Sequence, residues 1–318
     1  MNTPTQQIRP SLVPYLCLAG AVLLWGTSFV AMKFALTGLP PLAVVWLRMT
    51  LASAIMGLFW GRVPRAGRQK GDLRWLVLVC LLQPCLYFVL ESYAVSLTTS
   101  SQAGMVSALV PLLVAAGAWA FLREKLTLRT MLGIAVSMGG VAWLSLSGRA
   151  DESAPNPALG NFLELLAMFC AAGYMLVVKH LSSRYDSWHL TGLQAFAGAV
   201  FFLPGALLSG EGIPGWASAP PAAWGAVAYL GCVVTLGAFG LYNMAVVRLP
   251  AAQAAASINL VPLVAVLSGW ALLGETLAPA QLAACALILA GVLLGQTGKS
   301  RAVEAAPEAV EPRRAMEG

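Results

Sequence analysis

The chain has 318 residues, of which 59% are hydrophobic and 10% are charged, with a formal net charge of +6. A soluble globular domain carries roughly 45–50% apolar and about 25% charged residues. The composition therefore excludes an ordinary water-soluble enzyme or nucleic-acid-binding protein and predicts a protein whose surroundings are a lipid bilayer.

Ten apolar segments are long enough to cross a bilayer, because about 20 helical residues span its hydrocarbon core. Each is about twice as long as a transmembrane strand and lacks the alternation of apolar and polar residues that such a strand shows. The sequence thus predicts an all-α polytopic membrane protein with ten transmembrane helices. In chain order the segments are 13–37, 41–60, 73–95, 98–121, 129–147, 159–181, 188–208, 224–246, 251–273 and 279–297.

The second half of the chain repeats the first. Residues 88–141 recur 151 positions later without a gap, and 18 of the 54 aligned pairs are identical, among them a Gln, a Pro, a Trp and a Glu. A single half-chain repeat in an apolar protein is typical of transporters built from two related bundles. We predict a first five-helix repeat at 1–150, a second at 151–298 and a disordered cytoplasmic tail at 299–318.

The positions of the basic residues predict that the second repeat is inverted. Five crossings are an odd number, so the second unit enters the membrane from the opposite side. With the N-terminus inside, 16 of the 19 Lys and Arg residues lie in predicted cytoplasmic segments, as the preference for positive charge inside requires. The basic loop 61–74 matches 209–223, which has no Lys or Arg. We therefore expect both termini to be cytoplasmic, in the inner membrane of a bacterium.

Two charged residues inside the predicted spans are candidates for substrate binding. Arg48 lies near the middle of the second span, where a charge costs roughly 2.5–3.5 kcal/mol on insertion scales. It is either an anchor for an anionic substrate group or a structural residue paired with a buried acid. Glu91, in the third span, is either that partner or a proton carrier. Glu164, in the first turns of the sixth span, is expected to be structural.

Matched polar and proline positions suggest further functional residues. Gln102 and Gln253 occupy the same place in the two repeats, and Pro111 and Pro262 follow nine residues later. Proline removes a helical hydrogen bond, so matched kinks at these positions are either hinges or ordinary helix bends. Aromatic, hydroxyl and amide groups at membrane depth complete the set of candidate binding residues, although each also fits packing: Trp25, Ser28, Tyr87, Tyr242, Asn243 and Asn259.

The six cysteines lie in predicted spans without metal-ligand spacing and favour buried thiols over disulfides or a metal site. No cofactor is expected.

Several short motifs together resemble the EamA-type branch of the drug/metabolite transporter superfamily. They are Trp25-Gly26-Thr27-Ser28-Phe29 followed by Lys33, the stretch from Ala103 to Pro111 leading to Glu124, and the second copy ending Leu273-Gly274-Glu275. The resemblance covers residues 14–297 and implies two inverted five-helix repeats that export or exchange small metabolites such as amino acids, their derivatives or drugs. Two residues depart from the motif pattern of this family. One is Glu91, an acid shortly before the Tyr93-Ala94 pair, and the other is Arg123, which stands where the family often has Gly.

The sequence favours a secondary transporter that works by alternating access. Its central site is expected among the first, third and fourth spans and their counterparts, the sixth, eighth and ninth. The partners are a small-molecule substrate and the lipid bilayer, with proton coupling and a homodimer left open and no nucleic acid. A passive channel or a membrane scaffold is the alternative. A membrane enzyme is disfavoured because His180 and His189 fall in or beside one loop and no catalytic motif is visible.

Overall fold

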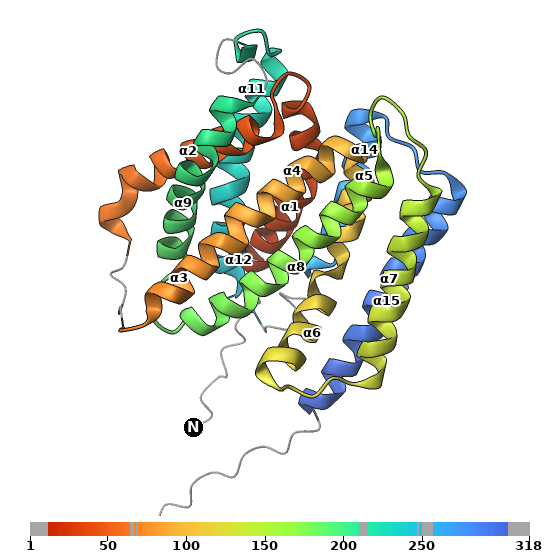
Figure 1. Ribbon diagram of the computed structural model, residues 1–318. Coiled ribbons are helices and arrows are strands. Elements are labelled where there is room, and N and C mark those ends of the chain that lie inside the picture. The colour runs from red at the N-terminus through yellow and green to blue at the C-terminus, as the bar shows by residue number, and fades with distance from the viewer. Residues whose placement is uncertain are drawn as a thin grey trace, which may run out of the picture.

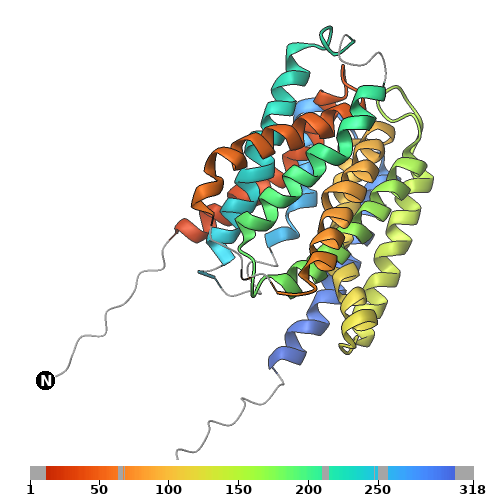
Figure 2. The same ribbon diagram turned by 60° about the vertical axis from the view of Figure 1, so that its left-hand side comes forward.

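The computed structural model describes residues 12–63, 67, 69–209, 215–246, 248–249 and 257–304. Within these ranges the regular elements are helices, packed into one bundle of long, roughly aligned rods (Figures 1 and 2). Nine of the described helices are long and apolar enough to cross a membrane, and a tenth, Val261–Leu273, is shorter. The protein is therefore a multi-pass membrane protein with two inverted five-helix repeats.

The first repeat contains five spans, two of which are interrupted. Its elements are α1 (Val13–Ala35), α2 (Pro41–Phe59) with a 3₁₀ turn η1 (Trp60–Arg62), α3 (Asp72–Cys80) joined by a π-helical turn η2 (Leu81–Leu86) to α4 (Tyr87–Leu97), α5 (Ser100–Val106) joined by a 3₁₀ turn η3 (Ser107–Leu109) to α6 (Val110–Leu122), and α7 (Leu128–Ser147).

The second repeat follows the same plan. Its elements are α8 (Pro157–Leu181), α9 (Ser187–Leu208), α11 (Pro221–Ala228) joined by a π-helical segment η4 (Tyr229–Ala238) to α12 (Phe239–Val246), α14 (Val261–Leu273) and α15 (Pro279–Glu304). The predicted boundaries of the first eight spans differ from the observed ones by no more than three residues. The predicted start of the ninth span, at 251, lies outside the described residues.

The last helix is longer than expected. We predicted that it ends at 297 and that a disordered tail begins at 299, whereas α15 continues to Glu304. The added segment contains Ala, Lys, Arg and Glu, which all have good helix propensity. Residues 305–318 lie outside the described part of the chain.

The interruptions recur in the same register in both repeats. A shift of 151 residues moves η2 (81–86) to 232–237, which lies inside η4. Pro111 and Pro262 both stand in the first turn of their helices, α6 and α14. The 3₁₀ turn before Pro111 gives the Ser107 carbonyl a donor in the Val110 N–H. The two repeats therefore share their helix breaks, and the hinge role of the two prolines stays a prediction.

Glycines bring α7 and α15, the last helices of the two repeats, into close contact (Figure 1). A Cβ atom at Gly133 would lie 2.5 Å from the Gly291 carbonyl oxygen, and the Ser137 hydroxyl donates to the Ile288 carbonyl at 3.0 Å. Small residues permit such backbone approach between membrane helices. Gly291 and Gly295, four residues apart in α15, thus take part in helix packing.

We expect Gly140→Ala to lower the thermal unfolding temperature of the purified protein, whereas Gly139→Ala leaves it unchanged or raises it. A Cβ at Gly140 would lie 2.7 Å from Ile288 Cγ1 and 2.9 Å from the Ile288 nitrogen, while nothing lies within 4 Å of one at Gly139. Overpacking of this kind costs about 1–3 kcal/mol. Unfolding followed by tryptophan fluorescence in detergent measures the difference. Equal transition temperatures would contradict this close packing.

Candidate functional site

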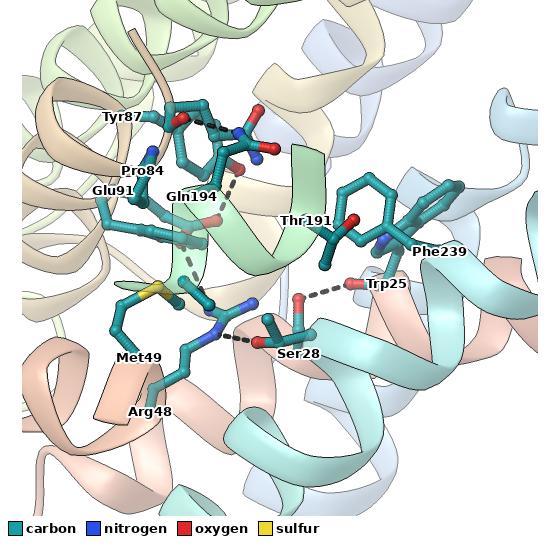
Figure 3. A pocket seen from close by; sticks show the side chains of 14 residues that line it. Trp25, Ser28, Arg48, Met49, Pro84, Tyr87, Glu91, Thr191, Gln194 and Phe239 are labelled. Carbon is teal, nitrogen blue, oxygen red and sulfur yellow. Dashed lines mark hydrogen bonds and ion pairs between the residues drawn. The ribbon is translucent and has the colours of Figure 1, made fainter. Parts of the chain in front are cut away.

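A cavity of about 100 Å³ lies in the interior of the bundle, between α1, α2, η2–α4, α9 and η4–α12 (Figure 3). A water molecule needs roughly 10–15 Å³ of such space, so the cavity holds several waters or the polar head of a small solute. Its walls come from the first, second, third, seventh and eighth spans. We expected the binding site among the first, third, fourth, sixth, eighth and ninth spans. The first, third and eighth of these line the cavity, together with the second and seventh, and the location of the binding site stays a prediction.

Arg48 contributes the positive charge of the cavity. Its side chain is buried, and its Nε donates a hydrogen bond to the Thr235 hydroxyl at 2.9 Å. Thr235 in turn donates to the Leu230 carbonyl at 2.8 Å, five residues back along the π-helical η4. The guanidinium carbon stands 4.3 Å from the centre of the Phe88 ring, a cation–π contact. These contacts orient Arg48 and leave most of its donors available.

Glu91 faces the same cavity and is only loosely paired with the guanidinium. The distance from Arg48 Nη1 to Glu91 Oε2 is 4.0 Å, longer than a hydrogen bond. Tyr87, one turn earlier in α4, donates from its hydroxyl to Glu91 Oε1 at 2.7 Å. Oε2 has no hydrogen-bond partner among the described residues. A polar group of a solute could therefore bind between the two charges.

Aromatic rings form the opposite wall. The Trp25 ring lies 5.7 Å from the Phe239 ring, edge to face, and both are separated from the charged side by Ser28 and Thr191 (Figure 3). The Ser28 hydroxyl donates to the Trp25 carbonyl at 2.6 Å. The cavity thus places an apolar surface across from a cation and an anion.

A backbone irregularity exposes one more polar group to the cavity. Gln83, within η2, leaves the helical region with φ −146° and ψ 120°. Its carbonyl accepts a hydrogen bond from Gln194 Nε2 at 2.6 Å, which links α9 to the interrupted third span. Pi-helical turns often occur at functional sites for this reason: they redirect side chains and carbonyls.

Half of the ten predicted binding residues line this cavity: Trp25, Ser28, Arg48, Tyr87 and Glu91. Three others lie outside its lining. Gln102 accepts a hydrogen bond from the Asn161 amide at 2.9 Å, and Asn259 exchanges two hydrogen bonds with Gln296. Tyr242 packs behind Trp25, with ring centres 5.3 Å apart.

The Asn243 side chain and all of Gln253 lie outside the described residues. Glu164, expected to be structural, is fully buried near Glu91.

The sequence interpretation missed several lining residues, chiefly Phe88, Thr191, Gln194, Thr235 and Phe239. The repeat contains a signal for three of them. Phe88 shifted by 151 is Phe239, an identical pair, and Pro84 shifted by 151 is Thr235, so both repeats contribute the same register positions to the cavity. Thr191 and Gln194 have no comparable signal, because polar residues near a helix start are common.

A second polar cluster joins the two repeats at the end of the bundle that we predict to be external. The Glu275 carboxylate, between α14 and α15, accepts hydrogen bonds from the backbone N–H and hydroxyl groups of Ser100 and Ser101 at 2.5–3.0 Å. These groups begin α5. Its counterpart in the first repeat, Glu124, is exposed. Among the described residues its carboxylate makes one ion pair, at 3.6 Å, with the exposed Lys179.

A hollow of about 810 Å³ opens beside the Glu275 cluster. Lys33 and Asp151 lie on its wall, and the Lys33 ammonium donates to the Ser153 carbonyl at 2.5 Å. Hydrogen bonds from Ser153 hold the pKa of the Asp151 carboxyl below its usual value. The hollow shares no lining residue with the central cavity, so the two spaces are distinct.

Comparisons with known proteins agree with this architecture. The chain is 26% identical over 291 residues to the uncharacterized transporter YetK of Bacillus subtilis, covering 90% of this chain and 88% of the relative. It is 29% identical over 276 residues to a probable terminal-alkyne amino-acid exporter of Streptantibioticus cattleyicolor, with 86% and 90% covered. It is 28% identical over 291 residues to a probable amino-acid metabolite efflux pump of Salmonella typhimurium, with 87% and 92% covered.

A solved crystal structure has the same fold, with a TM-score of 0.61 and 22% identity, covering 92% of this chain and 99% of that chain. The model of the EamA-like transporter family matches the chain twice, at residues 12–146 and 158–295. These two segments include nearly all the described spans and follow the internal repeat. The chain therefore belongs to the EamA-like transporter family.

Proposed function

We propose that the protein is a secondary-active transporter that moves small amphipathic metabolites of the amino-acid type across the membrane by alternating access. The observation that carries this proposal is the central cavity, where Arg48 and Glu91 stand 4.0 Å apart opposite the rings of Trp25 and Phe239. An α-amino acid offers a carboxylate to Arg48, an ammonium group to Glu91 and a side chain to the rings.

Two features support a carrier over a channel. The cavity lies between elements of both repeats, and inverted repeats commonly rock around a site near the middle of the membrane. The names of two relatives mention amino-acid export and amino-acid metabolite efflux. We accordingly propose export or exchange as the physiological activity.

Counterflow in proteoliposomes tests the transport proposal. Vesicles are preloaded with unlabelled L-phenylalanine, L-leucine or N-acetyl-L-phenylalanine, and uptake of the same labelled compound is followed. A carrier gives faster, saturable uptake when the opposite side is loaded. A channel gives uptake that does not respond to preloading, and a scaffold gives none. Either result, across a panel widened to other amino-acid derivatives, would contradict the proposal.

The proposed location is the bacterial cytoplasmic membrane, with both ends of the chain on the cytoplasmic side. The support is the clustering of basic residues described above, and the even number of crossings. Reporter fusions at the C-terminus and at Gly148, between α7 and α8, test the orientation. We expect the C-terminal fusion to be active only as a cytoplasmic reporter and the Gly148 fusion only as a periplasmic one.

A further inference from the structure

Among the residues that the structure describes, the membrane interior contains two buried carboxyl groups but one buried guanidinium. Arg48, Glu91 and Glu164 are 6%, 5% and 0% exposed. The remaining buried charged residue among those described, Asp72, stands at the start of α3 and pairs with Arg184 at 2.9 Å. If all three interior groups were ionised, the interior would carry one uncompensated negative charge. Such a charge is strongly disfavoured at low dielectric constant.

Glu164 is the carboxyl without a counter-charge. Neither of its oxygens has a hydrogen-bond partner among the described residues, although the side chain is fully buried. Glu91 has Arg48 at 4.0 Å and the Tyr87 hydroxyl at 2.7 Å. The Glu91 charge also repels a charge on Glu164 across the packed α4 and α8 helices. The proton that restores neutrality is therefore expected on Glu164.

The neighbouring helices supply no cation to Glu164. On α4 the titratable groups near it are Glu91 and Tyr87. The sequences of α5, η3 and α6 contain no titratable side chain, and the basic residue of α7, Arg129, is exposed at its start. The titratable residues of α3 and η2, which also pack on α8, are Asp72, Arg74, Cys80 and Cys85.

The basic residues at the far end of α8 are also distant from Glu164. Arg74 lies at the His180 end of α8, because the ring of its neighbour Trp75 contacts the His180 ring at 5.0 Å between centres. His180 is 16 residues from Glu164 along α8, which is about 24 Å at 1.5 Å per residue. Lys179 lies in the same last turn and is exposed. A proton thus remains the simplest source of the missing positive charge.

We propose that Glu164 holds a proton near neutral pH and that Glu91 is the group that takes up a further proton when an anionic substrate binds. This proposal rests on the proposed function. A substrate carboxylate at Arg48 removes the counter-charge of Glu91. The ammonium group of a zwitterionic substrate replaces this counter-charge. An anionic substrate has no ammonium group, so its binding requires a second proton. This proton is taken from water and converts the Glu91 carboxylate to the acid. The number of protons bound then follows the charge of the substrate.

Infrared spectroscopy tests the first part without any substrate. The full-length protein in lipid near neutral pH should show the C=O stretching band of a protonated carboxyl. Glu164→Gln should remove this band, Glu164→Asp should retain it, and Glu152→Gln, in an exposed loop, should leave it unchanged. Absence of the band, or a band that persists in Glu164→Gln, would overturn the proposal. Stabilisation by Na⁺ in place of the band would assign the charge balance to a metal cation instead.

Proton uptake on binding tests the second part. With a pH-indicator dye in weak buffer, N-acetyl-L-phenylalanine should cause uptake of about one proton per bound probe, and L-phenylalanine none. The double variant Glu91→Gln with Glu164→Gln should take up none with either probe. Equal proton uptake for both probes would refute the coupling. Probes that bind without counterflow would refute the proposed transport instead, while the infrared result would still decide whether Glu164 holds a proton.

Discussion

Replacement of Arg48 by alanine is expected to abolish substrate binding. Arg48 is the buried cation of the central cavity, and truncating one partner of a buried charge pair costs about 2–5 kcal/mol. Because 1.4 kcal/mol is a factor of ten, affinity should fall by roughly 30-fold or more. Thermal stabilisation of the detergent-solubilised protein by L-phenylalanine and N-acetyl-L-phenylalanine measures this effect. Counterflow of the same probes should disappear in parallel.

A loss of binding must be separated from a loss of folding, since Arg48→Ala also leaves Glu91 without its counter-charge. The double variant Arg48→Gln with Glu91→Gln is the matched control, because it removes both charges and keeps polar side chains of similar size. It should unfold near the parent temperature and still fail to bind the probes. If Arg48→Ala binds them as tightly as the parent, Arg48 has a structural role and the substrate anchor lies elsewhere.

Replacement of Glu275 by alanine is expected to open the predicted external end of the bundle. Its carboxylate joins α14–α15 of the second repeat to the start of α5 in the first by hydrogen bonds from Ser100 and Ser101. Hydrogen bonds to a charged group contribute about 1.5–3 kcal/mol each, although not additively. Loss of about 1.4 kcal/mol already shifts a two-state equilibrium tenfold.

The measurement uses a variant without native cysteines that carries Ser28→Cys in the central cavity. A membrane-impermeant thiol reagent is added from outside, and the rate at which it labels this cysteine is followed. Labelling should be at least about tenfold faster after Glu275→Ala, because the equilibrium between closed and open external ends shifts by that factor. The matched control is Glu124→Ala, at the same repeat position but exposed, which should label at the parent rate. Equal rates for both variants would mean that the Glu275 contact does not hold this end closed.

Glu275 is bonded to the other repeat whereas Glu124 is exposed, and the sequence explains this difference once the Glu275 contact is known. The counterparts of Ser100 and Ser101 are Ala251 and Ala252, which have no hydroxyl groups. A Cβ at Gly269 would lie 2.5 Å from both Glu275 Oε2 and Ser101 Oγ, and the matching residue in the first repeat is Ala118. A symmetric contact of Glu124 would therefore lack the hydroxyl donors, because the second repeat has Ala251 and Ala252 in their place, and it would lack the space, because the first repeat has Ala118 in place of Gly269.

The sequence by itself determined the class of protein, its spans and the relation of its two halves. Hydropathy identified each span because about 20 consecutive apolar residues are a local property of the chain. The shift of 151 positions identified the repeat, and the unequal distribution of Lys and Arg indicated its inversion. Arg48 and Glu91 were identifiable because a charge inside a span is costly wherever its partners lie.

Only the tertiary structure decided which polar side chains meet. The structure shows that Gln102 bonds to Asn161 and that Asn259 bonds to Gln296, partners that the sequence did not indicate, and the binding role of Gln102 and Asn259 stays a prediction. Thr235 joined the cavity because a π-helical segment turns it toward Arg48, 187 positions away in the chain. Hydrogen bonds between helices depend on rotation and packing of whole spans, and local composition carries no information about these.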